Sequence, residues 1–342
     1  MSTTRRVYKI KKTKKKRRKR LWIFLVPLLV LGLGATTYAA TLYMKAQNVF
    51  HDSYDPVEAS AKRSASVDPL EDNFSILFIG IDDSDERDYQ GNSRSDALIL
   101  ATFNKDQKSI KLLSIPRDSY VYVPAKGVTT KINAAHAAGG PKATMDTVEE
   151  LFDVPVDYYV RMNFNAFIDV VDSLDGIEVD VPYEMHEMDS HDKKNAIHLE
   201  KGIQTVDGEE ALAFARTRKQ DSDIQRGERQ QEVLKAIISK ATSAGSLTKY
   251  TDVMEAVGDN MTTNLQFSQI KGFIKYVTGD NGLNLETLKL EGQDSTINGT
   301  YYYQLNETSV ANTKLLLQSH LNLGPKEEVT NQTEAVQPQI EE

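Results

Sequence analysis

The sequence predicts an α/β sandwich in which helices cover both faces of a central sheet. Three near-continuous aliphatic runs, FSILFIGID (74–82), DALILATFN (96–104) and KSIKLLSIP (108–116), are typical of strands buried on both faces. Beyond them, segments with apolar residues at helical spacing alternate with strand-like segments, as expected for helices packed on a sheet. A charge-free run at 21–44 precedes all of these and predicts one transmembrane helix.

The N-terminal segment consists of a basic head at residues 1–20 and the apolar run at 21–44. At about 1.5 Å per residue, this run can cross a hydrocarbon core of about 30 Å. The basic head should stay cytoplasmic, so we expect a single-pass type II protein of the cell membrane with its domain outside. A cleaved signal peptide is the alternative, because TYAA (37–40) offers small residues to a peptidase. The apolar run continues to Met44, which favours an uncleaved anchor.

Charge is distributed unevenly along the chain. Residues 1–20 hold 12 of the 41 Lys and Arg residues and no acid, which leaves 29 bases against 49 acids, a formal −20, in the remainder. An acidic body is a poor partner for nucleic acid, whose phosphates require a basic face. The absence of cysteine excludes disulfides and thiolate catalysis.

The remainder divides by composition into a stalk, a domain and a tail. Residues 45–72 are polar and are expected to form an extracellular stalk. Residues 73–323 are enough for one well-buried core, and we expect them to form a single domain. Residues 324–342 have almost nothing to bury and are expected to be disordered.

The elements after the third strand follow from local patterns. DYYVRMN (157–163) is predicted as a strand, and NAFIDVVDSLDG (165–176) as a helix that ends in glycine. DGIEVDVP (175–182) alternates as a strand does, and DGEEALAFAR (207–216) opens with acids, as a helix N-terminus should. In RGERQQEVLKAIISKA (226–241) the aliphatic residues form one helical stripe. A helix near 268–279, a strand at 284–292 and a helix at 309–321 complete the set.

Charged residues gather where the first three expected strands begin or end. Asp82 closes the first strand, Arg117 closes the third, and Arg94 and Asp96 stand at the start of the second. In open α/β sheets the ligand crevice lies at the carboxyl ends of strands. Each of these residues alone is more typical of a turn. Together, two carboxylates and two arginines predict a site at one edge of the sheet.

A second charged segment, ARTRKQDSDIQRGERQQ (215–231), concentrates arginines in a chain with a net charge of −8. Arg216 and Arg218 follow one helix, and Arg226 and Gln230 share a face of the next, a face that continues into the core. Guanidinium groups and a helix N-terminus match phosphate oxygens, so the segment predicts a phosphate or pyrophosphate site with carboxylates suited to Mg²⁺. Surface ion pairs are the simpler explanation, and they require no ligand.

Several of these segments together resemble the LytR–CpsA–Psr family of cell-envelope proteins. The basic head and single anchor match, and so do seven motifs in the family's order over about residues 73–240: FIGID, RSDALIL, SIPRDSYV, KINAAHAAGG, LDGIEVDVP, FARTRK and DSDIQRGERQQ. The resemblance implies an α/β/α sandwich around a central mixed β-sheet, with a long apolar pocket for a polyprenyl chain. It also implies a Gram-positive source.

The same resemblance implies a membrane-anchored phosphotransferase. Members of the family move a glycopolymer (wall teichoic acid, capsule or related polysaccharide) from an undecaprenyl-pyrophosphate carrier to the C6 hydroxyl of N-acetylmuramic acid in peptidoglycan. Mg²⁺, or Mn²⁺ in its place, assists the reaction. Phosphoryl transfer needs positioning and charge neutralisation more than covalent chemistry, which agrees with the arginine-rich segment.

Carried over by residue, the resemblance assigns a role to each candidate. Asp82 and Asp96 would hold the metal, and Asp223 would be the general base, with Asp221 as its local rival. Asp223, Arg226 and Arg117 form the expected catalytic set. The residues expected to bind the pyrophosphate are Arg94, Arg117, Lys131, Arg216, Arg218, Arg226 and Gln230.

Two other functions are consistent with the same residues. A pyrophosphohydrolase of lipid-linked or nucleotide substrates would use the same anion site, with water in place of the sugar hydroxyl. A non-catalytic envelope regulator would only bind at the surface, although an acidic ectodomain without a DNA-binding motif argues against direct action on genes. The chain has no G-x-x-x-x-G-K-[ST] motif, which argues against a P-loop nucleotidase.

Overall fold

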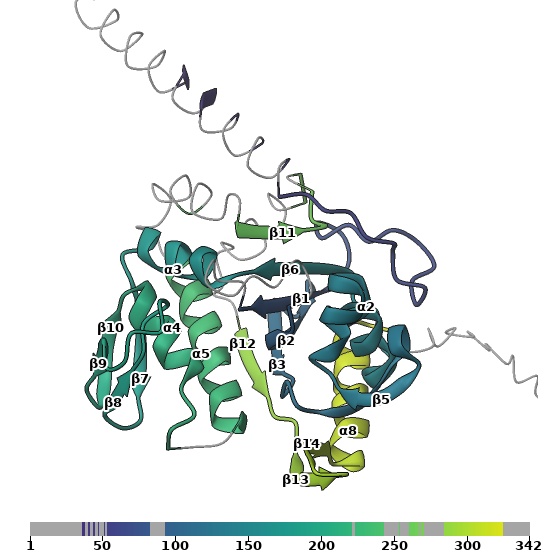
Figure 1. The fold of residues 1–342 in the computed structure, drawn as a ribbon. Helices are drawn as coiled ribbons and strands as arrows, with labels where there is room; N and C mark the ends of the chain where they lie inside the picture. The colour runs from purple at the N-terminus through teal and green to yellow at the C-terminus, as the bar shows by residue number, and fades with distance from the viewer. Residues whose placement is uncertain are drawn as a thin grey trace, which may run out of the picture.

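A six-stranded sheet lies at the centre of the molecule, with helices on both of its faces (Figure 1). The computed structural model describes residues 53–82, 93–220, 223–242, 260–266 and 284–323, together with a few single positions outside these ranges. The strands, in order across the sheet, are β11 (Met261–Thr263), β6 (Tyr158–Met162), β1 (Phe74–Ile81), β2 (Ser95–Asn104), β3 (Ser109–Ser114) and β12 (Asn284–Leu288). The predicted α/β sandwich is confirmed.

The sheet is mixed, as the family resemblance implied. β1 is antiparallel to β2, and β2 is antiparallel to β3. β6 is parallel to β1, β12 is parallel to β3, and β11 is antiparallel to β6 at one edge. β2 and β3 form a hairpin with a short turn, whereas each parallel pair requires a long crossover connection.

Side chains that alternate between the two faces of each strand form a separate hydrophobic core on each face of the sheet. In β1, Leu77 and Ile79 join one core, and Phe74 and Ile76 join the other. Because successive side chains of a strand point to opposite faces, a continuous aliphatic run can bury both faces. The covering helices are α2 (Ala134–Phe152) and α8 (Glu307–His320) on the first face, and α3 (Phe164–Ser173) and α5 (Asp223–Ala241) on the second.

A smaller unit packs beside α3 and α5. It contains a two-stranded sheet, a hairpin and one helix: β7 (Ile177–Val181) with β10 (Gly202–Val206), β8 (Met185–Glu187) with β9 (Ile197–Leu199), and α4 (Gly208–Arg216). The Asp207 side chain accepts a hydrogen bond from the Glu210 amide at 2.9 Å, and the Glu210 carboxylate accepts one from the Asp207 amide at 3.0 Å. This capping box fixes the start of α4 where the acidic pattern predicted it.

Like the strands β8 to β11, two further hairpins and one long helix were not expected from the sequence. The hairpins are β4 (Tyr120–Val123) with β5 (Val128–Lys131), joined by η1 (Pro124–Lys126), and β13 (Gly292–Ile297) with β14 (Thr300–Leu305). The helix is α2, in which Gly139 and Gly140 depart from helical geometry and Pro141 follows them. This kink interrupts the helical spacing, which explains why the segment gave no clear helical pattern.

Several expected segments fall outside the described residues. These are the basic head at 1–20, most of the anchor at 21–44, most of the helix near 268–279, and the tail at 324–342. Among the residues that the structure does describe, none of the helices combines the length and the apolar character that a membrane span requires.

Candidate active site

The sheet topology brings three of the predicted residues to one edge. Asp82 follows the carboxyl end of β1, and Arg117 follows that of β3. β1 and β3 run in the same direction because each is antiparallel to β2. The amino end of β2 therefore lies at the same edge, and its register pairs Ile81 with Ser95, next to Asp96. Asp96 reaches the site through antiparallel pairing, whereas Asp82 and Arg117 follow the expected rule for strand ends.

A cavity of about 590 Å³ opens between this edge, α3, α4 and α5. Its wall is mainly apolar and includes Phe78, Ile99, Phe167, Leu234 and Ile237. Charged and polar side chains from the sequence predictions also line it: Asp82, Asp96, Arg117, Arg216, Arg218, Arg226 and Gln230. The arginine-bearing face of α5 thus continues into an apolar cavity.

Arg226 is a buried cation on the first turn of α5, with only 5% of its surface exposed. Its Nη1 lies 3.3 Å from Asp223 Oδ1, and its Nη2 donates to the carbonyl of Asp96 at 3.4 Å. Burial lowers the pKa of Arg226 to about 10, against the attraction of Asp223, and the nearby charge of Arg117 acts in the same direction as burial. The surroundings of Arg226 therefore carry too little negative charge for a buried guanidinium.

Arg117 has more negative charge around it than Arg226 has. Its Nη1 bonds to Asp96 Oδ1, and its Nε lies 3.7 Å from Asp118 Oδ2. Burial by itself would lower the pKa of Arg117, but Asp96, Asp118 and Asp223 outweigh it and raise the pKa. The Nε atoms of Arg117 and Arg226 are both buried, and neither has a hydrogen-bond partner among the described residues. Buried N–H groups of this kind are suited to the oxygens of an anion.

The segment between α4 and α5 is held by a residue that the sequence reasoning did not single out. Arg229 is 4% exposed, and its guanidinium donates to the carbonyls of Phe214 and Thr217. It thereby fixes the end of α4 next to Arg216 and Arg218. Arg216 lies 4.4 Å from the ring centroid of Phe164. Nothing in the local pattern distinguishes Arg229 from its neighbours, because its partners are backbone carbonyls from another helix.

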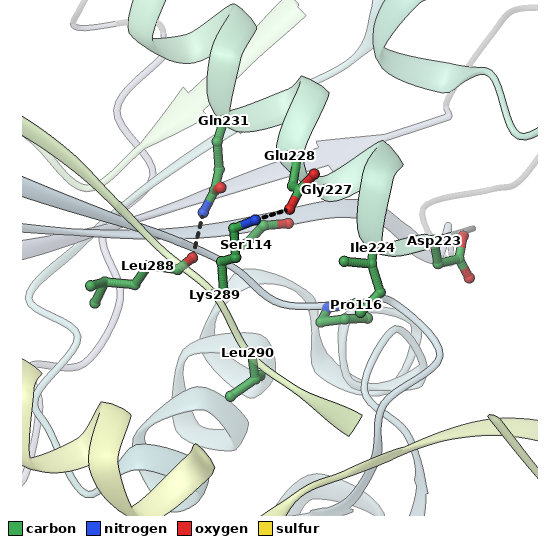
Figure 2. Close-up of a pocket in the computed structure, with 10 residues that line it drawn as sticks. All are labelled: Ser114, Pro116, Asp223, Ile224, Gly227, Glu228, Gln231, Leu288, Lys289 and Leu290. Carbon is green, nitrogen blue, oxygen red and sulfur yellow. Dashed lines mark hydrogen bonds and ion pairs between the residues drawn. The ribbon is translucent and has the colours of Figure 1, made fainter. Parts of the chain in front are cut away.

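α5 approaches the sheet closely at Gly227, next to Arg226. A Cβ at Gly227 would lie 2.7 Å from Ser114 Oγ, so only glycine fits at this distance without displacement. One turn further on, the Gln231 amide donates to the carbonyls of Leu112 and Leu288 at 3.0 and 3.1 Å. Figure 2 shows Gln231 and the residues around it, between α5 and the ends of β3 and β12. These contacts fix the height of Arg226 above the sheet.

Three of the predicted residues lie outside the large cavity. Arg94 is exposed, and Lys131 bonds to Asp118 at 2.7 Å; neither lines the cavity. Asp223 lines a separate pocket of about 30 Å³ with Pro116 and Leu290 (Figure 2). The Asp223 carboxylate still lies 3.5 Å from Arg218 as well as 3.3 Å from Arg226. Asp221 is outside the described residues.

The donor set at the sheet edge suits a hard cation. Asp82 and Asp96 offer carboxylate oxygens from neighbouring strands, and both line the cavity beside the arginines. Two carboxylates with phosphate oxygens are a common environment for Mg²⁺. Within the described part of the chain, the one group of three metal-binding side chains is Glu184, His186 and His198, exposed on the β8–β9 hairpin and outside the cavity lining.

The model of the LytR_cpsA_psr family matches residues 40–319 of the chain. The chain belongs to the LytR_cpsA_psr family. Among its relatives, polyisoprenyl-teichoic acid–peptidoglycan teichoic acid transferase TagT of Bacillus subtilis is 41% identical, over 91% of this chain and 98% of TagT. TagV of the same organism, named for the same activity, is 36% identical, over 87% of this chain and 77% of TagV.

Solved structures of this family share the fold. TagT bound to LIIa-WTA superposes with a TM-score of 0.68 at 42% identity, covering 79% of this chain and 99% of that one. TagT with bound octaprenyl pyrophosphate lipid superposes with a TM-score of 0.63 at 39% identity, covering 79% and 99%. The family resemblance inferred from the seven motifs is thus confirmed.

Proposed function

We propose that the protein is a phosphotransferase that moves a glycopolymer from an undecaprenyl-pyrophosphate carrier to the C6 hydroxyl of N-acetylmuramic acid in peptidoglycan. One observation carries the proposal: an apolar cavity of about 590 Å³ is lined by four arginines as well as by aliphatic side chains. The names of TagT and TagV support teichoic acid as the glycopolymer. Capsule or a related polysaccharide would suit the same chemistry.

The cavity matches both halves of a polyprenyl pyrophosphate. Each methylene that leaves water for an apolar wall contributes about 0.8 kcal/mol, so a chain of isoprene units gains affinity with each unit that is buried. At the other half, Arg117 and Arg226 offer buried N–H groups, and Arg216 and Arg218 add further charge. A nucleotide would leave most of the aliphatic wall without a partner.

The residues near Asp223 suggest how the transfer proceeds. The hydroxyl oxygen of the acceptor forms a bond to the phosphorus that carries the glycopolymer, and its proton passes to the Asp223 carboxylate. The bond from that phosphorus to the bridging oxygen breaks, and the electron pair leaves with polyprenyl phosphate. Arg117 and Arg226 stabilise the charge that develops on the phosphate oxygens. Mg²⁺ or Mn²⁺, held by Asp82 and Asp96, would supply additional neutralisation when bound.

We further propose that the apolar run at 21–44 anchors the domain outside the cell membrane. A lipid-linked donor is confined to the membrane surface, so an anchored enzyme meets it at a raised effective concentration. The pyrophosphate bond of the donor stores the driving energy, and no external ATP is required. A basic segment at 1–20 would hold the N-terminus on the anionic cytoplasmic face.

The test is reconstitution of the full chain with an undecaprenyl-pyrophosphate-linked saccharide and peptidoglycan. Mass spectrometry should detect a muropeptide joined to the saccharide through a phosphodiester. Asp223→Asn should lower the transfer rate by about 10² to 10⁴, because it removes the proton acceptor but keeps the shape. Asp153→Asn, the same change at an exposed residue that binds Lys62 and Lys314, is the matched control and should not alter the rate.

Different outcomes exclude different functions. Release of polyprenyl phosphate at the same rate with and without peptidoglycan would favour the pyrophosphohydrolase over the transferase. If Asp223→Asn kept full transfer, the assignment of the base would be wrong. A chain that neither consumes nor binds the lipid donor would leave only the non-catalytic regulator.

A further inference from the structure

Arg117 and Asp118 lead from the large cavity to a second surface of the molecule. Asp118 is 6% exposed, and its carboxylate forms an ion pair with Lys131 at 2.7 Å. The Tyr303 amide donates to the carbonyl of Asp118 at 2.9 Å, and Ser119 forms a bridge with the same tyrosine. The hairpin β13–β14 is therefore fixed to the loop that carries Arg117. None of the residues of this hairpin lines the large cavity.

Three tyrosines and a lysine gather on this second surface, and we call Tyr120, Tyr301, Tyr302 and Lys131 the tyrosine cluster. The rings of Tyr120 and Tyr302 meet edge to face, with centroids 4.7 Å apart. Lys131 Nζ lies 5.5 Å from the centroid of Tyr301 and 5.8 Å from that of Tyr302. Ring pairing and cation–π contact hold the side chains in place. Tyr301 is 39% exposed, and its hydroxyl donates to the Asp294 carboxylate at 2.8 Å.

Asp223 contacts the arginines that line the large cavity and also lines a smaller pocket. On one side its carboxylate pairs with Arg226 and Arg218, which line the cavity. On another side it lines the small pocket of Figure 2 together with Leu290, two residues before β13. The pKa of the Tyr301 hydroxyl is raised mainly by burial and by the hydrogen bond to Asp294, and the charge of Asp223 makes a smaller contribution in the same direction.

We propose that the tyrosine cluster is the subsite for the acceptor glycan, in which a pyranose ring of a peptidoglycan strand stacks on Tyr301 and brings its hydroxyl to Asp223. This inference rests on the proposed transferase function. A pyranose has a flat face of C–H groups and a rim of hydroxyls. An exposed tyrosine ring matches that face, and the carboxylate of Asp294 lies next to the Tyr301 hydroxyl as an acceptor for the rim.

The geometry favours the acceptor over the donor as the occupant. The large cavity accounts for the lipid and pyrophosphate of the donor, and none of the four residues of the tyrosine cluster lines it. A nucleophile must approach the phosphorus from the side opposite the leaving group. The pocket of about 30 Å³ beside Asp223 holds little more than one water, so a sugar ring has to bind outside it, on the surface where Tyr301 is exposed.

The experiment measures transfer by the full chain while the concentration of a peptidoglycan oligosaccharide is varied at saturating donor. Tyr301→Ala should raise the KM for the acceptor about tenfold or more, the usual cost of truncating an aromatic anchor. Tyr301→Phe keeps the ring and should stay within about threefold of the unmodified chain, since only the bond to Asp294 is lost. Tyr54→Ala is the matched control, because Tyr54 is 37% exposed and bridges to Thr263 at the other edge of the sheet.

Binding assays separate this proposal from the proposed function. Octaprenyl pyrophosphate should bind Tyr301→Ala as tightly as it binds the unmodified chain. Direct binding of the oligosaccharide, followed by NMR without turnover, should weaken in Tyr301→Ala. If the chain binds the oligosaccharide through Tyr301 but transfers nothing, the transferase fails and the glycan subsite stands.

Three results would overturn the subsite. An unchanged acceptor KM in Tyr301→Ala would do so, and so would an effect on the donor KM alone, which would assign the cluster to the donor glycopolymer. Dimerisation that is lost in Tyr301→Ala while acceptor binding is kept would identify the surface as a contact between two copies. If Tyr301→Ala unfolds at a lower temperature, Tyr301→Leu, which keeps an apolar contact for the Lys131 stem, replaces it in the same assays.

Discussion

Replacing the buried pair Arg226 and Asp223 should stabilise the protein while it abolishes lipid binding. The pKa of Arg226 falls from its ordinary value to about 10 because the guanidinium is buried with too few partners. Each tenfold change in the protonation equilibrium corresponds to about 1.4 kcal/mol. Keeping Arg226 charged therefore lowers the stability of the folded state by about 3 kcal/mol. Because the folded-state pKa lies below the unfolded one, this cost is present at every pH below about 10 and is relieved only as the pH rises from there toward the pKa of the unfolded chain.

The double variant Arg226→Met/Asp223→Asn removes this cost without leaving a lone charge. The single variant Arg226→Met would strand Asp223, whose nearest remaining cation is Arg218 at 3.5 Å. The lowered pKa already includes the attraction of Asp223. Loss of the hydrogen bond from Arg226 to the carbonyl of Asp96 offsets part of the gain, so we expect a net stabilisation of about 1 to 2 kcal/mol. For a domain of this size, that corresponds to a rise of about 2 to 8 °C in the melting temperature.

The assay is thermal unfolding of the full chain with and without octaprenyl pyrophosphate. A ligand at about 100 times its Kd stabilises by about 2.7 kcal/mol, so the unmodified chain should melt several degrees higher with lipid. The double variant should melt higher without lipid and show no further rise with it. Arg63→Met/Asp157→Asn is the matched control: this pair has two bonds, at 2.8 and 2.7 Å, so its removal should lower the melting temperature and keep the lipid response. If the Arg226 double variant behaved like this control, the reasoning would be refuted.

Three further predictions concern the cavity, the helix contact and an internal histidine. Leu234→Trp should narrow the apolar cavity and displace two to three methylenes of the lipid. This displacement costs about 2 kcal/mol of binding free energy, or about 30-fold in affinity. Titration with octaprenyl pyrophosphate should show the loss, whereas inorganic pyrophosphate should bind as before. Gly227→Ala should push α5 off Ser114, at a cost of about 1 to 3 kcal/mol, and lower kcat/KM. Gly227→Ala/Ser114→Ala should restore most of both, because it removes the 2.7 Å contact and leaves only that with the Cβ at 3.3 Å; no recovery at all would disprove the contact. Burial, together with the charge of Lys111, lowers the pKa of His320 to about 4, and Thr102 and Ser109 bond its two ring nitrogens at 2.8 Å each. The unfolded chain therefore binds a proton near pH 6.5 that the folded chain does not, and up to about 3 kcal/mol of stability should be lost between pH 6.5 and 4. His320→Asn should flatten that slope in unfolding measured against pH, and parallel slopes would show that another group is responsible.

The sequence predicted most of the sheet because its strands are buried on both faces. FSILFIGID and DALILATFN carry aliphatic residues at nearly every position, and only a strand between two helical layers needs that composition. α4 was predicted for a local reason, the acidic start that becomes a capping box. The hairpins β4–β5 and β13–β14 were missed because their mixed, partly exposed residues carry no strong periodicity. α2 was missed because its kink at Gly139 and Gly140 divides the pattern.

The site was predicted in composition and only partly in arrangement. Seven of the named residues line one cavity, because strand ends and a helix face are features that the sequence encodes locally. Arg94 and Lys131 lie elsewhere, and Arg229 was overlooked, because each position depends on partners distant in the chain. Tyr301 carried no signal of its own, because its contact with Lys131 joins segments that are distant in the chain.

The sequence by itself determined the composition of the parts: a buried sheet, an arginine-rich helix start, and an apolar stripe on the same face of that helix. Only the tertiary structure decided that α5 stands away from α3 along this stripe, so that the stripe lines a cavity and not a solid core. The physical reason lies in the range of the forces. Periodicity and capping act within a few residues, whereas a cavity depends on how closely separate elements pack. The contact of Gly227 with Ser114, for example, sets the distance of α5 from the sheet.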